Sequence, residues 1–312
     1  MVALEVQSLA GKIGEFYLGP VDMVIPEGSI TGILGPSGCG KTLLLRMIAG
    51  LHEPVRGKVL IDGKDMTDSP PSERRIAFIF QDEALFPHFN TYNNVAFPLK
   101  IRKDRLVDEK VRNKAHELDG LYEYLDLKPS QLPAGIRKLT AIGRETLREY
   151  SLILMDEPFE RLDRKIRGEL RVLVKKLLLH IGKSVLIILN DPEDAMSITD
   201  RLYVMTDGSF IRNGNPREVY ENPGSAETLE LMSPHGTNTL GDMVFRPEDV
   251  ELSEAGIKAV LVHSSPLDGK KALCSALIDN NPVMLILPAE VTENTEITLK
   301  ITKSYSFGSR NS

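Results

Sequence analysis

The sequence predicts an α/β fold built on a parallel sheet, followed by a small all-β domain. Short runs of almost only apolar residues recur along the chain, which is typical of strands buried on both faces of a parallel sheet. A stretch with helical spacing lies between two of these runs and completes a strand–helix–strand unit. Beyond a linker-like tract, the runs become short, β-type and separated by turns.

The predicted strands of the parallel sheet are bounded by charged or turn residues. They are residues 30–34, 76–80, 152–155 and 185–189. The first strand leads into a glycine-rich turn and then into a helix over 43–49, which Gly50 ends. The helix between the last two strands ends at Gly182 and has apolar residues at helical spacing, namely Ile166, Leu170, Leu173, Val174, Leu177, Leu178 and Ile181.

Two parts of the chain depart from this alternation. Residues 100–127 are rich in charge and poor in apolar positions, which predicts exposed helices in a subdomain, at about 88–148, inserted between two sheet strands. The composition changes again near residue 232. We therefore expect the α/β domain at 1–232, a linker at 233–241 and the all-β domain at 242–312. Strand-like runs in the last of these lie at residues 259–262, 283–287 and 297–302.

Composition narrows the class of protein. The 312 residues are 42% hydrophobic and 26% charged, with a net charge of −6 and interspersed signs, which argues against a nucleic-acid partner. No apolar run approaches the roughly 20 residues that a membrane span requires, and the first residues lack the pattern of a signal peptide. Two cysteines cannot form a disulfide framework. These features predict a cytoplasmic protein whose link to a membrane, if any, runs through a partner.

A glycine-rich segment fits the phosphate-loop pattern Gly-x4-Gly-Lys-[Ser/Thr] at every fixed position. It consists of Gly35, Pro36, Ser37, Gly38, Cys39, Gly40, Lys41 and Thr42. In such a loop, backbone N–H groups surround a polyphosphate, the lysine faces the β- and γ-phosphates, and the hydroxyl ligates Mg²⁺. A chance glycine turn is the alternative, but the strand before the loop and the helix after it favour nucleoside triphosphate binding.

Two carboxylates end a later strand. Asp156 and Glu157 follow the apolar run 152–155 directly, and ligands of α/β proteins bind beyond the carboxyl ends of such strands. Asp156 is suited to hold Mg²⁺ through water, and Glu157 to orient the water that attacks the γ-phosphate. An exposed acidic turn would be the simpler interpretation of this pair alone. Together with the phosphate loop, the pair predicts hydrolysis.

With both motifs in place, the chain resembles the ATP-binding subunits of ABC transporters over nearly its whole length. Residues 79–88 (Ile-Phe-Gln-Asp-Glu-Ala-Leu-Phe-Pro-His) resemble the Q-loop of that family. Residues 245–250 (Phe-Arg-Pro-Glu-Asp-Val) resemble the start of the regulatory TOBE domain of its importer branch. The resemblance implies an ABC-type ATPase domain with an inserted helical subdomain, followed by a small OB-like barrel.

The same resemblance implies roles for individual residues. The nucleotide is ATP with Mg²⁺, and Gln81 senses both the metal and the attacking water. Phe16 is the aromatic residue we expect to stack on adenine, with Tyr17 and a plain core role as alternatives. The segment 85–88 faces the coupling helix of a membrane permease subunit.

The implied partners are permease subunits, a second ATPase subunit and a separate solute-binding protein. The chain would then lie on the inner face of the cell membrane without crossing it. A short C-terminal domain and a compact segment at 14–16 favour an inorganic ion, an oxyanion or ferric iron, over a sugar as the transported solute.

The signature segment departs from the family pattern Leu-Ser-Gly-Gly-Gln. The aligned residues here are Leu132, Pro133, Ala134, Gly135 and Ile136. In the family this segment contacts the γ-phosphate bound by the opposite subunit. Pro133 offers neither a hydroxyl nor an N–H, and Ala134 places a Cβ where backbone must approach closely. Losing such hydrogen bonds to a charged group costs on the order of 1.5–3 kcal/mol each.

Two further departures lie near the same phosphate. Asn190 replaces the family's switch histidine, so the side chain can donate a hydrogen bond but carries no charge. In the D-loop, residues 158–163, Glu160 and Arg161 replace small residues. In a homodimer each site would carry all the defects, whereas an intact partner ATPase would separate them. The sequence therefore predicts a slow ATPase or a heterodimer, with an ATP-binding regulator as the alternative.

Overall fold

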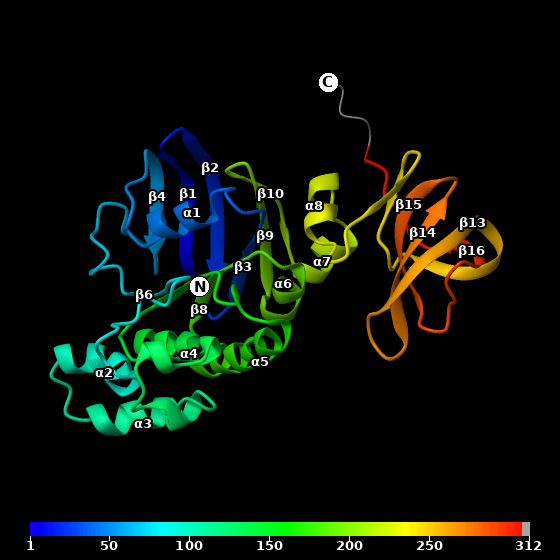
Figure 1. Cartoon of the computed structure of the whole chain (residues 1–312). Helices are drawn as coiled ribbons and strands as arrows, with labels where there is room; N and C mark the ends of the chain where they lie inside the picture. The colour runs from blue at the N-terminus through cyan, green and yellow to red at the C-terminus, as the bar shows by residue number, and fades with distance from the viewer. Residues whose placement is uncertain (308–312) are drawn as a thin grey trace. The chain divides into compact units, whose positions relative to one another are not determined.

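The computed structural model describes residues 1–307 and divides into two compact units, Met1–Glu218 and Val219–Ser312 (Figure 1). The division falls before the boundary predicted at residue 232. The predicted linker 233–241 contains strand β11 (Asn238–Leu240), and the last residues of the predicted domain 242–312 lie outside the described part. As a functional division, the predicted limits stay a prediction.

A six-stranded sheet forms the centre of the first unit. Its order is β10 (Ser209–Gly214), β9 (Arg201–Thr206), β3 (Ile30–Leu34), β8 (Ser184–Leu189), β7 (Leu152–Asp156) and β6 (Ile76–Ile79). All neighbours run parallel except β10, which pairs antiparallel with β9. Every residue of β3, β6, β7 and β8 is buried, which explains why these strands read as continuous apolar runs.

A second, antiparallel sheet was not predicted. Its order is β2 (Phe16–Pro26), β1 (Val2–Ile13), β4 (Arg56–Ile61) and β5 (Lys64–Asp65). Helix α1 (Lys41–Ile48) packs against both sheets and shares one apolar core with them. The alternation in β1 is broken because its register with β2 shifts at three places and Ser8 has φ of 44°. A period-2 pattern therefore does not appear in the sequence.

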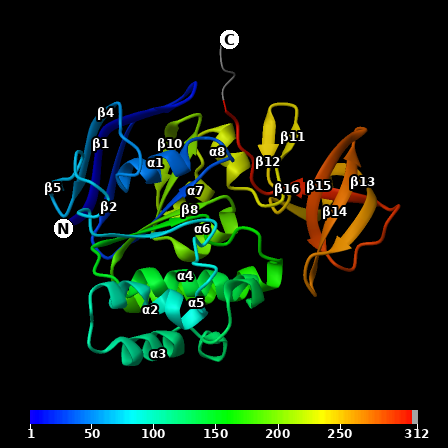
Figure 2. The same ribbon diagram turned by 60° about the vertical axis from the view of Figure 1, so that its left-hand side comes forward.

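The predicted helical insertion lies between β6 and β7 (Figure 2). Its elements are α2 (Thr91–Ile101), α3 (Val107–Glu117), the short 3-10 helices η1 (Tyr122–Tyr124) and η2 (Pro129–Gln131), and α4 (Ala134–Thr146). Helix α2 begins at a true cap, because the Asn90 side chain accepts a hydrogen bond from the Asn93 N–H. Helix α4 packs against α2, β6 and α5, so it joins the insertion to the sheet.

Helix α5 (Arg164–Ile181) connects β7 to β8, as the sequence predicts. Asp163 caps its start by accepting from the N–H groups of Lys165 and Ile166. Gly182 ends it with φ of 63°, a left-handed conformation that glycine adopts without strain. Helix α6 (Pro192–Ile198) follows β8, and α7 (Pro216–Glu221) leads into the second unit. No helix within residues 1–307 has the length and apolar character of a membrane span.

The second unit is mainly antiparallel β structure. It contains α8 (Ala226–Leu231), a two-stranded sheet of β11 and β12 (Met243–Phe245), and a sheet in the order β15 (Asn281–Pro288), β14 (Lys271–Ile278), β13 (Val250–Pro266) and β16 (Glu296–Ile301). Inward residues of these strands form a separate apolar core. The α/β class and the C-terminal all-β region are thus confirmed. Sequence reasoning missed β14, and among the described residues β15 and β16 remain the edges of an open sheet.

Candidate nucleotide-binding site

Four neighbouring parallel strands end at one edge of the central sheet. Leu34 of β3 pairs with Leu189 of β8, and Asp156 of β7 pairs with Ile188 of β8. The residues that follow the strand ends therefore meet along this edge. The phosphate loop follows β3, Asn190 follows β8, Glu157 follows β7, and Gln81 comes shortly after β6. Sequence segments that are far apart thus form one polar edge, where ligands of α/β sheets bind.

The phosphate loop turns tightly before α1. A Cβ on Gly35 would lie 2.2 Å from the Met205 carbonyl oxygen, so only glycine fits there. Gly38 and Gly40 have φ of 83° and 109°, and Gly40 is the residue from which α1 starts. The Lys41 ammonium donates to the carbonyl oxygens of Gly35 at 2.7 Å and Pro36 at 2.9 Å. The loop has the shape and the cation that a polyphosphate needs.

Within this loop, Pro36 and Ser37 are exposed, whereas Cys39 is buried. Burial raises the pKa of the Cys39 thiol, and the nearby Lys41 charge only partly opposes this effect. The thiol therefore stays protonated at neutral pH. Its contribution to the loop is a small apolar contact next to Gly35.

Thr42 and Asp156 are predicted Mg²⁺ residues, and the structure brings them together. The Thr42 hydroxyl donates to Asp156 Oδ1 at 3.1 Å. Burial raises the pKa of the Asp156 carboxyl, while the Thr42 hydrogen bond lowers it. A hydroxyl next to a buried carboxylate fits a hard divalent cation, which would also offset the burial of charge. No group of three His, Cys, Asp or Glu side chains that could hold a metal ion occurs in residues 1–307.

Gln81 and Glu157 also meet. The Gln81 amide donates to Glu157 Oε2 at 2.7 Å, which joins the segment after β6 to the one after β7. Glu157 has φ of 47°, an uncommon conformation for a residue with a side chain, so the chain turns sharply just beyond Asp156. The two residues predicted to handle the attacking water are therefore direct partners.

Two buried cations of α4 hold the Q-loop backbone in place. Lys138 donates to the Gln81 carbonyl oxygen and pairs with Glu83 at 3.1 Å. Arg144 donates to the carbonyl oxygens of Ala84 at 2.7 Å and Glu83 at 3.1 Å. Glu83 and Ala84 both have positive φ, which explains why the loop needs these anchors. Sequence reasoning gave Lys138 no role, because nothing in the sequence pairs it with a loop so far away.

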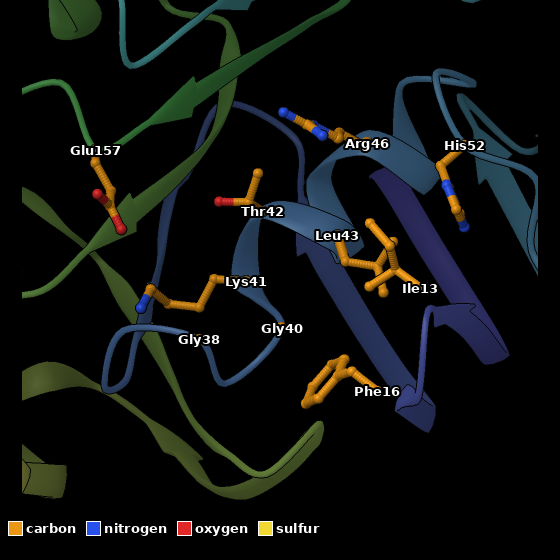
Figure 3. Close-up of a pocket in the computed structure, with 10 residues that line it drawn as sticks. All are labelled: Ile13, Phe16, Gly38, Gly40, Lys41, Thr42, Leu43, Arg46, His52 and Glu157. Carbon is orange, nitrogen blue, oxygen red and sulfur yellow. The ribbon is translucent and has the colours of Figure 1, made fainter.

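A pocket of 340 Å³ opens beside the phosphate loop (Figure 3). Phe16 lies on the side of Gly40, and Glu157 lies at the other end of the group, beyond Thr42. Phe16 packs against the core and lines this pocket, whereas Tyr17 is 45% exposed and is not among the lining residues. The position of Phe16 fits an adenine contact better than that of Tyr17.

The pocket also contains residues that the sequence did not reveal, namely Ile13, Leu43, Arg46 and His52. Arg46 stands one helical turn after Thr42, so the spacing of α1 could have indicated it. His52 Nε2 lies 3.0 Å from the Lys12 carbonyl oxygen, to which the ring can only donate a hydrogen bond. The unpredicted antiparallel sheet places Ile13 and His52 here, so no local signal existed for them.

Asn190 contacts the D-loop and does not line the pocket. Its Nδ2 donates to Glu160 Oε1 at 3.0 Å, and its Oδ1 is buried without a hydrogen-bond partner. The pair joins the end of β8 to the segment that follows Glu157. Both residues depart from the family pattern, as the sequence shows. Their contact could not be predicted, because they lie 30 residues apart in the chain.

The signature segment lies at the start of α4, away from the pocket. Leu132 is buried and Pro133 is exposed, with α4 beginning at Ala134. No acidic residue occupies the first turn, so its N–H groups keep their positive end uncovered. A Cβ on Gly135 would lie 3.2 Å from Ile166 of α5, which gives this glycine a packing reason of its own. Within one chain, the segment does not reach the phosphate loop's pocket.

Comparisons with known proteins agree with this architecture. The family model described as ABC transporter matches residues 18–160. The trehalose/maltose import ATP-binding protein MalK of Thermococcus litoralis is 39% identical over 246 residues, which cover 76% of this chain and 66% of that protein. The sulfate/thiosulfate import ATP-binding protein CysA of Mycobacterium bovis is 34% identical over 284 residues, which cover 90% of this chain and 80% of that protein.

A solved structure shows the same fold. It is the ATP-binding cassette MJ0796, a dimer in a post-hydrolysis state bound to ADP and Pi, with a TM-score of 0.60 and 30% identity. The alignment covers 69% of this chain and 99% of that structure's chain. The match with MalK spans just under two thirds of that relative. Together with the order of the strand ends and the motifs on them, these similarities show that the chain belongs to the ABC transporter family and contains its ATPase fold.

Proposed function

We propose that this chain binds and hydrolyses ATP as the ATPase subunit of an ABC importer. The observation that carries the proposal is the polar edge of the sheet, where the phosphate loop, the Thr42–Asp156 pair and the Gln81–Glu157 pair meet. A protein that only binds nucleotide has no need of a carboxylate paired with an amide beside the γ-phosphate position. The relatives named as import ATP-binding proteins support the same function.

Each residue has a distinct task in this proposal. The loop from Gly35 to Thr42 binds the phosphates, and Phe16 stacks on adenine. Mg²⁺, held by Thr42, Asp156 and Gln81, would neutralise developing charge on the phosphates. Glu157 takes up the proton of the attacking water, and the Gln81 amide orients both. Asn190 donates to a γ-phosphate oxygen once its amide has left Glu160.

A groove next to the Q-loop is our candidate for the permease contact. Its volume is 400 Å³, and Phe86, Phe97, Arg102 and Arg148 are among its lining residues. Phe86 is the member of the predicted segment 85–88 that lines it. Its ring lies 4.5 Å from that of Phe97, and buried Asn94 fixes its backbone through hydrogen bonds to both the N–H and the carbonyl oxygen. Glu145 also lines the groove and pairs with Arg144 and Arg148, so its walls carry both signs of charge. An apolar floor with a charged rim suits an amphipathic helix.

The signature segment requires a second subunit to reach a nucleotide. We propose that Leu132–Ile136 acts on the ATP of the opposite subunit through the uncovered start of α4. In a homodimer, Pro133 and Asn190 act on every site. A strong slowing of hydrolysis by these two residues would therefore favour a different ATPase as the second subunit, and a weak one would favour a second copy. The solved dimer with 30% identity supports assembly in pairs.

The transported solute is the last part of the proposal. We favour an oxyanion, because the sulfate/thiosulfate relative aligns with 90% of the chain, including much of the second unit. The trehalose/maltose relative aligns with less of it, 76%. In this proposal the second unit acts as the TOBE-type regulatory domain, and the chain works on the inner face of the membrane together with permease subunits and a solute-binding protein.

Turnover by the full chain tests the proposal. The wild type should release phosphate from MgATP, and Glu157→Gln should lower kcat by at least about 100-fold, since general acid–base groups contribute about 10²–10⁴. The variant should still bind MgATP, and its mass in solution with MgATP shows whether the chain pairs with itself. Stable ATP binding without turnover in the wild type would favour a regulator, and a monomeric Glu157→Gln with bound MgATP would favour a heterodimer.

A further inference from the structure

Glu160 and a γ-phosphate would compete for the same side chain, that of Asn190. Asn190 has two N–H donors on Nδ2 and one acceptor, Oδ1. One N–H goes to Glu160 Oε1 at 3.0 Å, and Oδ1 is buried and unpartnered. A phosphate oxygen only accepts hydrogen bonds, so Oδ1 cannot serve it. The nitrogen that faces Glu160 is therefore the same atom that a γ-phosphate would need, and the contact leaves it one N–H in an orientation set by Glu160.

The backbones on both sides of this contact are fixed. Asn190 directly follows β8, and the next residue, Asp191, caps α6 by accepting from the Glu193 N–H at 2.7 Å. On the other side, the Glu160 N–H donates to the Glu157 carbonyl oxygen at 3.2 Å, and Asp163 caps α5. Only side-chain torsions can separate the pair. Rotation about these side-chain torsions would free the amide while the backbone hydrogen bonds on both sides stay in place.

Charged side chains lie around the Glu160 carboxylate. Arg167 of α5 interacts with Glu160, Asp191 and Asp194, and it lies 3.0 Å from an Asp191 carboxylate oxygen. An ionised carboxylate accepts more strongly than a neutral group, so it holds the amide more firmly than a serine would.

We propose that Glu160 is a positioning residue that holds the Asn190 amide against the D-loop and so limits its access to the γ-phosphate. This inference rests on the proposed ATPase function and deepens it. The Glu160 carboxylate acts through Asn190 and touches neither nucleotide nor water. Its removal therefore speeds hydrolysis, whereas loss of a merely structural contact would slow it.

Steady-state ATPase kinetics of the full chain distinguish a positioning role of Glu160 from a merely structural contact. Glu160→Ser should raise kcat by about 3- to 10-fold, the value of one ordinary hydrogen bond, with KM for ATP changed by less than about 2-fold. Glu160→Gln should give a smaller rise, because its amide oxygen still accepts. In an Asn190→Ala background, both substitutions should leave kcat unchanged. Glu169→Gln, at an exposed position of α5, is the control for the change of charge.

Two kinetic outcomes overturn the proposal. A lower kcat in Glu160→Ser would mean that the contact supports catalysis. An equal rise in the presence and absence of Asn190 would mean that the carboxylate repels the phosphate directly, without acting through the amide.

A titration tests the contact without any hydrolysis. In Asn190→His, the imidazole should have a higher pKa beside Glu160 than in Asn190→His with Glu160→Gln, by about half a pH unit or more, because a nearby carboxylate favours imidazolium. Proton NMR of the imidazole C–H signals measures it. Arg167, Asp191 and Asp194 face both variants equally. An identical pKa in the two variants would show that residue 160 does not hold residue 190. A wild type without turnover would instead overturn the proposed function.

Discussion

Asp156 is the residue where function and stability conflict most directly. It is a carboxylate with 6% of its surface exposed, and burial is the main reason its pKa is raised. In the proposed function Asp156 is ionised and holds Mg²⁺, whereas its burial in the fold works against the charged form. Because the folded pKa is above the unfolded one, stability falls as pH rises between the two values and stays reduced above them.

Asp156→Asn should therefore stabilise the chain measured without nucleotide and weaken its response to MgATP. At pH 7 the variant should melt higher, since a gain of about 1 kcal/mol raises Tm by about 2–4 °C in a domain of this size. The difference should shrink as the pH falls through about 4, where the carboxyl becomes protonated in the unfolded chain as well. The exposed Asp126→Asn serves as the control. A variant that melts lower at pH 7, with MgATP stabilisation intact, would contradict both halves of the argument.

Single residues also show where sequence reasoning stops. The phosphate loop and the Asp156–Glu157 pair were predicted because each motif is contiguous and ends a buried strand. Phe16 was chosen from two adjacent aromatics, and the pocket contains it. His52 could not be predicted, because its place in the pocket depends on a sheet whose strands are irregular.

At the scale of an element, α5 offers a matched pair of glycines. Gly168 lies inside the helix and Gly182 ends it with φ of 63°, and a Cβ on either would meet no atom within 4 Å. The two substitutions to alanine therefore differ only in backbone conformation. Steric clashes of the added methyl group therefore contribute to neither change in stability.

Gly168→Ala should stabilise the chain by up to about 1 kcal/mol, since alanine is the better helix former. Gly182→Ala should destabilise it by about 1–2 kcal/mol, the cost of a left-handed conformation with a Cβ. Urea unfolding with constant m-values measures both. Gly182→Asn should lose less than Gly182→Ala, because asparagine tolerates this conformation. Equal effects of the two alanine substitutions would refute the backbone explanation.

Elements were predictable where one period dominates. The buried strands β3, β7 and β8 and the helix α5 follow from apolar runs and helical spacing, and the structure places them within one or two residues of the prediction. The long strand β13 was recognised only over 259–262. Its register with β16 shifts between Leu252 and Ile257, around Gly256, where a Cβ would lie 2.2 Å from the Leu299 carbonyl oxygen. The bulge interrupts the alternation on which strand prediction depends.

At the scale of the whole molecule, the chain has two apolar cores in two compact units. The residues of the candidate ATP site all belong to the first unit. A ligand that binds only the folded first unit should stabilise that unit and leave the second unchanged. The second unit is stabilised instead by its own buried polar centre.

Arg246 is that centre. Its side chain is fully buried and donates to Ser233 Oγ at 2.9 Å, to the Tyr305 hydroxyl at 2.6 Å and to the Tyr220 carbonyl oxygen at 2.7 Å. It also lies 3.8 Å from the centre of the Tyr220 ring. These partners come from α7, the end of α8 and the last described residues, so one guanidinium connects the segments that flank the β structure.

Arg246→Leu should therefore destabilise the second unit alone, by about 3 kcal/mol, because the hydrogen bonds from a buried charged group to Ser233, Tyr305 and Tyr220 are lost. Calorimetry should show one transition lowered by about 10 °C or more and another at its wild-type temperature, which MgATP still raises. Lys270→Met removes an exposed charge from the same unit and should change neither transition. If Arg246→Leu lowered both transitions equally, the two units would unfold as one, and the thermodynamic separation of the two cores would be refuted.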